Sequence, residues 1–144
     1  KDEDIDRKKC FSYWKFAHFW FELVISFQFL IPIFYWSVLF DGDKGTAIEF
    51  TTNLFNHLFT GLIVWADFLL SKTVFYKRHF LMIFGVGIIY IIVNLIVTKA
   101  TGDPPYKTLD WESGMTAVYV IGAIVLAAIG FTIAYCIAKK RNKQ

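Results

Sequence analysis

The chain has 144 residues, of which 56% are hydrophobic and 19% aromatic, including 16 Phe. A water-soluble domain of this length needs polar faces on its helices, and this composition leaves little room for them. The net charge of +3 is not gathered on one face of a soluble fold, which excludes a typical nucleic-acid-binding domain. We therefore expect a single integral membrane domain over residues 1–144, with no nucleic-acid partner.

Four apolar segments separated by charged residues follow one another along the chain, at about residues 16–40, 48–70, 80–98 and 115–138. Each is close to the ~20 apolar residues that an α-helix needs to cross a ~30 Å hydrocarbon core. We predict an all-α, polytopic membrane bundle with four transmembrane helices. The remaining tails and loops are too short to form a separate soluble domain. The predicted localisation is that of an integral, multi-pass membrane protein.

The basic residues predict the topology of the bundle. If the chain crosses the membrane at each segment, all 15 Lys and Arg residues except Lys44, Lys99 and Lys107 fall on one side. By the positive-inside rule, that side is the cytoplasm or an organelle matrix, and both termini lie there. This pattern requires an even number of crossings, so it favours four helices over three or five.

Turn-forming residues predict where the loops lie. Residues 41–45 form a turn by their Gly content and charge, and residues 71–79 form a short cytoplasmic loop. Residues 99–113 form the longest loop, which contains Gly102, Pro104 and Pro105 and is therefore expected to be an ordered system of turns and not a helix. In the first segment, Pro32 marks a candidate kink, which neighbouring membrane helices tolerate.

The last segment carries small residues at spacings of four and eight, namely Gly114, Gly122, Gly130, Ala134 and Ala138. These positions fall on one face of a helix. Small residues at such spacing let membrane helices approach closely. We interpret the face as a packing seam and not as a ligand site.

The second segment carries a polar stripe, which consists of Glu49, Asn53, Asn56, His57, Thr60 and Asp67. At ~100° per residue, these side chains fall within an arc of roughly 100° on one helix. Ionisable groups in a membrane segment are costly, and they usually face the bundle interior or a water-filled cavity. The stripe is therefore the first candidate for a functional site.

Three interpretations of this stripe stay open. It can be a hydrogen-bonded helix interface, as Asn, Thr and His residues form between membrane helices. Alternatively, His57 is a catalytic base that Asn53 or Asn56 holds and that activates a nucleophile on another helix. Thr60 is expected to bond a backbone carbonyl. The third interpretation is a metal or haem ligand, but no His, Cys, Asp or Glu set has zinc-like spacing, so we predict no metal and no cofactor.

The outer loop supplies the remaining candidate residues. Asp110 or Ser113 is placed to cap the last helix, and Tyr106 and Trp111 suit a membrane interface. The same loop is expected on the side of the membrane where His57 lies, so it can also roof a cavity above that residue. We therefore name Tyr106, Asp110 and Trp111 as candidate binding residues, together with Asp67 at the far end of the stripe.

These residues carry a family resemblance. The pattern Asn53-x-x-Asn56-His57-x-x-Thr60, followed by Thr101-Gly102 and by Tyr106-x-x-Leu109-Asp110-Trp111, resembles the rolling stone family. It is more distantly similar to the androgen-induced membrane hydrolases, which cleave fatty acid esters of hydroxy fatty acids. The resemblance covers most of the chain, from about Trp14 to the last helix.

The resemblance implies a specific site. The hydrolases are six-helix proteins with a Thr nucleophile and a His within the membrane, and His57 matches their catalytic His. Their nucleophilic Thr belongs to an earlier helix than any here, so this chain looks like the last four helices of six. Rolling stone proteins themselves are linked with myoblast fusion, so the resemblance does not by itself imply hydrolysis.

Two functions follow as hypotheses. The first is a Thr/His-type lipid-ester hydrolase with membrane lipids as partners, in which His57 is the general base; it predicts a pocket that reaches His57. The second is a non-catalytic accessory subunit whose helices pack against other transmembrane helices of a larger complex. It predicts that the polar stripe is fully paired and leaves no cavity.

Overall fold

The computed structural model describes residues 13–40, 42 and 46–142, and that part of the chain is all-α with no β-strand. Four of its helices are long and apolar enough to cross a membrane: Tyr13–Leu39, Ala47–Leu70, Lys77–Thr101 and Gly114–Arg141. These helices confirm the predicted fold class, and their bounds agree with the four apolar segments to within one helical turn. Four such helices are compatible with a multi-pass membrane protein.

Two of the four membrane helices contain a π-helical turn. The first consists of α2 (Tyr13–Phe34) and the π turn η1 (Tyr35–Leu39). The second consists of α3 (Ala47–Leu54), the π turn η2 (Phe55–Phe59) and α4 (Thr60–Leu70). The third and fourth are the unbroken helices α5 (Lys77–Thr101) and α6 (Gly114–Arg141), joined by a loop that holds the 3₁₀ turn η3 (Lys107–Leu109).

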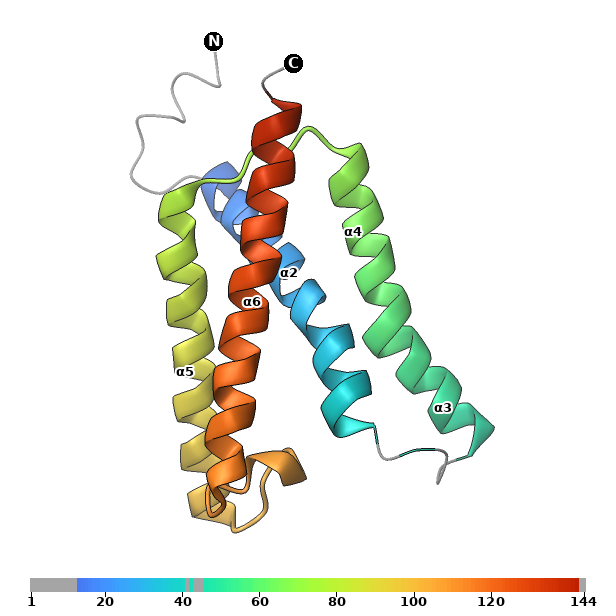
Figure 1. Cartoon of the computed structure of the whole chain (residues 1–144), viewed down its shortest axis with the longest axis vertical. Helices are drawn as coiled ribbons and strands as arrows, with labels where there is room; N and C mark the ends of the chain where they lie inside the picture. The colour runs from blue at the N-terminus through green and yellow to red at the C-terminus, as the bar shows by residue number, and fades with distance from the viewer. Residues whose placement is uncertain (1–12, 41, 43–45, 143–144) are drawn as a thin grey trace.

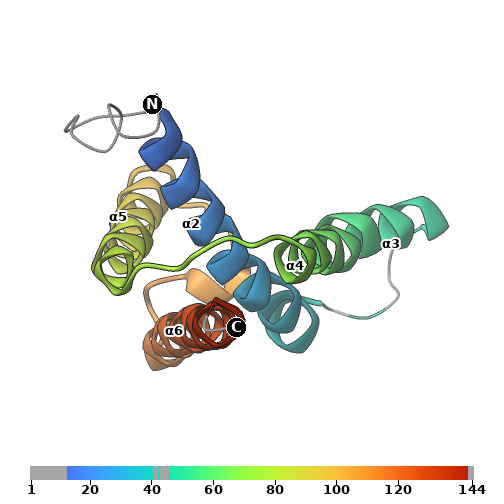
Figure 2. The same cartoon turned by 90° about the horizontal axis from the view of Figure 1, so that it is seen from above.

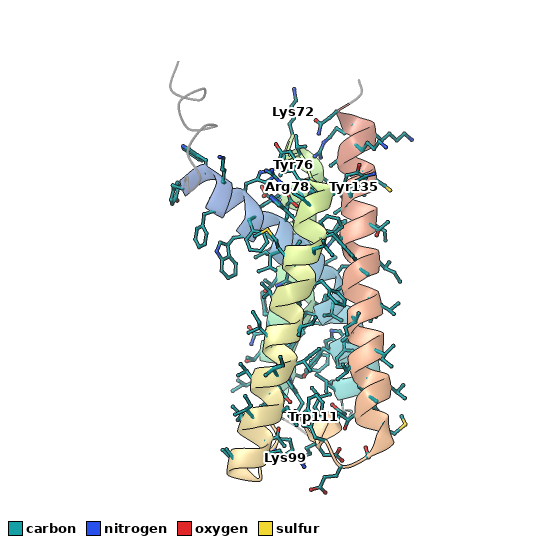
Figure 3. All side chains as sticks on the ribbon, turned by 90° about the vertical axis from the view of Figure 1, so that its left-hand side faces the viewer. Lys72, Tyr76, Arg78, Lys99, Trp111 and Tyr135 are labelled. Atoms are coloured by element: carbon teal, nitrogen blue, oxygen red, sulfur yellow. The ribbon has the colours of Figure 1, made fainter. Side chains whose placement is uncertain are left out.

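The central helix of the bundle is α2, which packs against α6, α4 and α5 (Figure 1). Seen from above, α5 and α6 lie on one side of α2 and the α3–α4 helix lies on the other (Figure 2). The α3 end of that helix leans away from the other three (Figure 1). Lys72 and Arg78 lie at one end of the bundle, the basic end, and Lys99 and Trp111 lie at the other, the loop end (Figure 3).

Two glycines allow the close packing of α2. A Cβ atom at Gly130 of α6 would lie 2.7 Å from Phe29 Cβ and 2.9 Å from the carbonyl oxygen of Ser26. A Cβ atom at Gly61 of α4 would lie 2.9 Å from Cγ of Pro32. These distances are shorter than a real Cβ atom can approach another atom without a clash. Each helix therefore reaches α2 so closely only because it has a glycine at that position.

The packing seam predicted on α6 is confirmed over half of its length. Gly130, Ala134 and Ala138 are buried, but a Cβ at Gly114 or Gly122 would meet nothing within 4 Å. The prediction was wrong for these two residues because α6 separates from α2 towards the loop end. The hydrophobic core accordingly lies at the basic end, where Phe68, Phe75 and Phe131 pack together.

The helix ends correct the predicted loop bounds. Because α5 runs from Lys77 to Thr101, the predicted loops at 71–79 and 99–113 are both shorter, and His79 lies in the first turn of α5. Gly102 caps the end of the helix: its φ of 70° is left-handed, and its N–H donates to the Thr98 carbonyl at 2.9 Å. Pro32 lies inside α2 without ending it. The turn at 41–45 lies outside the described residues, apart from Gly42.

A glycine-to-alanine pair tests the crossing of α2 and α6. Gly130→Ala places a methyl group against Phe29 and Ser26, so we expect it to destabilise the protein by about 1–3 kcal/mol despite the better helix propensity of Ala. Gly122→Ala, on the same helix and with open space around it, should leave the melting temperature unchanged or raise it. Thermal unfolding in detergent measures both variants. Equal melting temperatures would contradict the close crossing.

Candidate functional site

A cavity of about 330 Å³ lies between α2, α5 and α6, from the level of Phe131 to the loop end. Its walls are almost entirely apolar, and they include Phe27, Phe34, Ile83, Phe84, Ala123 and Ala127. The cavity exists because α6 leaves α2 beyond the Gly130 crossing and carries small alanine side chains on its inner face. An apolar cavity of this size in a helix bundle suits a hydrophobic ligand.

Among the described residues, His57 contributes the only basic side chain in the cavity wall. Its ring stacks on Tyr35, with the ring centroids 3.7 Å apart and the ring planes 9° from parallel. Its Nδ1 atom is buried and has no hydrogen-bond partner among the described residues. The stacking fixes the plane of the imidazole, and the unpaired nitrogen remains able to bind a ligand or move a proton.

The π turns position this pair. Tyr35 is the first residue of η1, and His57 is the central residue of η2. A π turn inserts one extra residue into a helix and redirects the side chains around it, and such turns recur at functional sites. Tyr35 was not predicted, and the only signal for it in the sequence is its place in the aromatic run Phe34–Trp36, which begins two residues after Pro32.

The π turn η2 also interrupts the predicted polar stripe, so its residues do not share one face. Of its six residues only His57 lines this cavity, whereas Asn56 and Asp67 are exposed. Glu49 instead completes a capping box at the start of α3, in which its Oε2 accepts the Thr46 N–H at 2.8 Å. The prediction of one common arc was therefore wrong, because it assumed regular α-helical spacing across residues 55–59.

The predicted partners of His57 fall into two groups. Thr60 donates its hydroxyl proton to the carbonyl oxygen of Phe55 at 2.9 Å, which confirms the expected backbone bond. Asn53 and Asn56 make no hydrogen bond with His57 in the described part of the chain, where the contact on its ring comes from Tyr35. An orienting role for either asparagine stays a prediction.

The outer loop covers the loop end of the cavity. Tyr106 and Leu109 line the cavity, which places one of the predicted binding residues there. Trp111 lies outside the cavity wall and donates its indole N–H to the Asn94 side chain at 2.9 Å, which ties the loop to α5. Its φ of 59° is left-handed, a strained conformation for tryptophan that this bond helps to hold.

Asp110 anchors the same loop to α6. Its Oδ1 accepts the backbone N–H groups of Glu112 at 3.0 Å and Ser113 at 3.1 Å, and the Thr116 hydroxyl at 2.8 Å. These bonds lower the pKa of Asp110 to about 2. Neither predicted cap forms: the Ser113 side chain makes no capping bond, and Asp110 binds the N–H groups just before α6 and the Thr116 side chain. Asp110 does not line the cavity.

A second polar cluster lies at the basic end of the bundle. His18, Glu22 and His79 come from α2 and α5, and their donor atoms lie within 4.8 Å of one another. Spacing along the chain did not reveal this cluster, because its members lie on two different helices; the absence of a metal stays a prediction. The signal available in the sequence was the His18–Glu22 pair, one helical turn apart in an apolar segment.

Comparison of the chain with protein-family models, with curated proteins and with solved structures gave no match.

The pH dependence of stability tests the Asp110 anchor. Because the folded-state pKa is about 2, below the ordinary value of about 3.9, the ionised carboxyl stabilises the fold above about pH 4 and loses this effect as the pH falls towards 2. We expect Asp110→Asn to melt lower than the native chain at neutral pH and to lose less stability on acidification. Thermal unfolding in detergent from about pH 6 to pH 2 measures this; parallel profiles would contradict the anchor.

Proposed function

We propose that this membrane protein binds the acyl chain of a lipid ester in the cavity between α2, α5 and α6, and that His57 acts as general base in its hydrolysis. The observation that carries the proposal is the meeting of an apolar cavity of about 330 Å³ with a half-buried imidazole whose buried Nδ1 has no hydrogen-bond partner among the described residues. A membrane lipid presents the matching chemistry, because an apolar chain ends at a polar, hydrolysable ester.

The imidazole supplies acid–base chemistry at the ester. His57 would take the proton of a nucleophilic hydroxyl as that oxygen bonds to the ester carbonyl carbon. It would return the proton to the alcohol oxygen as the ester bond breaks, and would then take a proton from a water molecule whose oxygen bonds to the acyl carbon, so that the fatty acid leaves and the hydroxyl is restored. Stacking on Tyr35 supports this role, because it restricts the imidazole to one plane.

The nucleophile follows from the resemblance to the rolling stone family and the membrane hydrolases, which implies a Thr on an earlier helix. Among the described residues, the cavity wall contains no Ser or Thr; its hydroxyl groups belong to Tyr35, Tyr90, Tyr106 and Tyr119. The Thr that the resemblance implies would have to reach the His57 end of the cavity, where the ester carbonyl is expected.

The alternative hypothesis, an accessory subunit, predicts a fully paired stripe and no cavity. The cavity, and the Nδ1 of His57 that has no partner in the part of the chain the structure describes, count against that arrangement and favour ligand binding. The exposed side chains of Asn56 and Asp67 would still suit contact with other transmembrane helices, and such contact is compatible with the hydrolase proposal.

Covalent labelling tests the proposal. A fluorophosphonate probe is added to membranes that contain the native, full-length protein, His57→Ala or the control Leu62→Ala, an exposed position on the same membrane helix. We expect the native protein and the control to be labelled, and labelling of His57→Ala to be slower by about 10²-fold or more, because an activated hydroxyl needs its base.

The folded state of each variant is checked by thermal unfolding before labelling. Absence of labelling in the folded native protein, or equal labelling of folded His57→Ala, would contradict a His57-activated nucleophile.

A further inference from the structure

Three side chains converge at the basic end of the bundle, well away from His57. The Oε1 atom of Glu22 lies 2.7 Å from Nε2 of His18 and 3.0 Å from Nδ1 of His79. Glu22 is completely buried, His79 is 8% exposed and His18 is half-buried at the rim. One ligand atom from each residue lies within 4.8 Å of the other two.

The fold holds these groups in place from several sides. His18 and Glu22 are one turn apart on α2 and therefore share a face, which the first turn of α5 brings to His79. The backbone N–H of Tyr76, just before α5, donates to Glu22 Oε1 at 3.3 Å. The Tyr76 ring lies 5.3 Å from the His18 ring and 5.4 Å from the His79 ring, measured between centroids. Phe19 packs edge-on against His79.

The bonding of the cluster is incomplete without a further group. Glu22 Oε2 is buried and has no hydrogen-bond partner in the described part of the chain. His18 Nε2 and His79 Nδ1 lie close to Glu22 Oε1, but neither ring nitrogen meets it in hydrogen-bond geometry. A buried carboxylate in a membrane helix requires a compensating positive charge, and such groups usually mark functional sites.

We propose that His18, Glu22 and His79 form a binding site for a divalent transition-metal ion, with Zn²⁺ as the best fit. Two imidazole nitrogens and one carboxylate oxygen are a common donor set for Zn²⁺, with water in the fourth position. Bonds of about 2.0–2.1 Å in a tetrahedron place neighbouring donor atoms about 3.3 Å apart. The two separations from Glu22 Oε1, 2.7 and 3.0 Å, need to open only slightly, and the two imidazole nitrogens lie within 4.8 Å of each other.

The ion would neutralise the buried carboxylate and link α2 to α5. Both imidazoles bind as neutral ligands, so any proton on a metal-facing nitrogen is released when the ion enters. The Tyr76 N–H and the rings of Tyr76 and Phe19 would surround the ligands, fix their orientation and limit access of water.

Metal binding by the full-length protein tests the site. The protein is purified in detergent with a tag that contains no histidine, stripped with a chelator, incubated with Zn²⁺ and analysed by inductively coupled plasma mass spectrometry after removal of free ion. We expect one Zn²⁺ per chain. Co²⁺ in place of Zn²⁺ should give the visible absorption of a tetrahedral site with nitrogen and oxygen ligands.

Two variants identify the ligands. Glu22→Gln keeps the shape of the side chain but loses its charge, and His79→Ala removes one nitrogen ligand. Each is expected to weaken Zn²⁺ binding more than about tenfold. Even the loss of a residue that only hydrogen-bonds a metal ligand lowers the metal affinity by about tenfold or more. His57→Ala is the matched control, because it removes a histidine that lies outside the cluster, and it should bind Zn²⁺ as the native protein does.

The result that would overturn the proposal is a folded native protein that binds no Zn²⁺, or binding that Glu22→Gln leaves unchanged. If His79→Ala does not fold, Glu22→Gln and the Co²⁺ spectrum decide the outcome. The readout is metal content and not lipid hydrolysis, so failure of this site is distinguishable from failure of the proposed His57 chemistry.

Discussion

The close crossing of α2 with α6 at Gly130 is the constraint on which the rest of this structure depends. Ser26 and Phe29 on α2 occupy the space that a side chain on α6 would need. Above the crossing, towards the basic end, the helices stay together and bury Ile25 and Ala134 completely. Below it, α6 separates from α2 and the cavity opens. One contact between backbones therefore divides the bundle into a packed half and a hollow half.

The two halves carry different chemistry. The hollow half presents apolar walls with the imidazole of His57, which suits a lipid chain with a reactive polar end. The packed half holds the buried carboxylate of Glu22 between two imidazoles, a cluster that suits a small cation. In a lipid bilayer both sets of polar groups are costly unless they bind something, which is the physical basis of both proposals.

The sequence predicted the features that depend on local chemistry. The four membrane helices follow from the length and apolarity of their segments, and the Thr60 backbone bond follows from hydroxyl chemistry in helices. It failed where the geometry depends on the whole fold. No residue pattern indicates the π turn at residues 55–59. The prediction therefore placed the polar stripe on one face of a regular α-helix, and the π turn interrupts that face.

The same limit explains the missed contacts. Tyr35 reaches His57 only because two π turns on neighbouring helices face each other. His79 reaches Glu22 because the segment before α5 crosses the end of α2, and Tyr76 of that segment bonds Glu22. Pairings of this kind join positions far apart in the chain, and neither composition nor spacing encodes them. Gly114 and Gly122 show the opposite case. They have the spacing of a helix-packing seam, but no other helix lies against them.

Photo-crosslinking in membranes tests most directly whether the cavity is a lipid-chain site. The ligand is a fatty acid ester with a diazirine at the far end of its acyl chain, and mass spectrometry identifies the labelled peptides. The account predicts labelling of the cavity faces of α5 and α6, abolished by Ala127→Phe, which fills the cavity, and unaffected by Ala117→Phe on the exposed face of α6. Labelling of outward faces only, unchanged by Ala127→Phe, would contradict it.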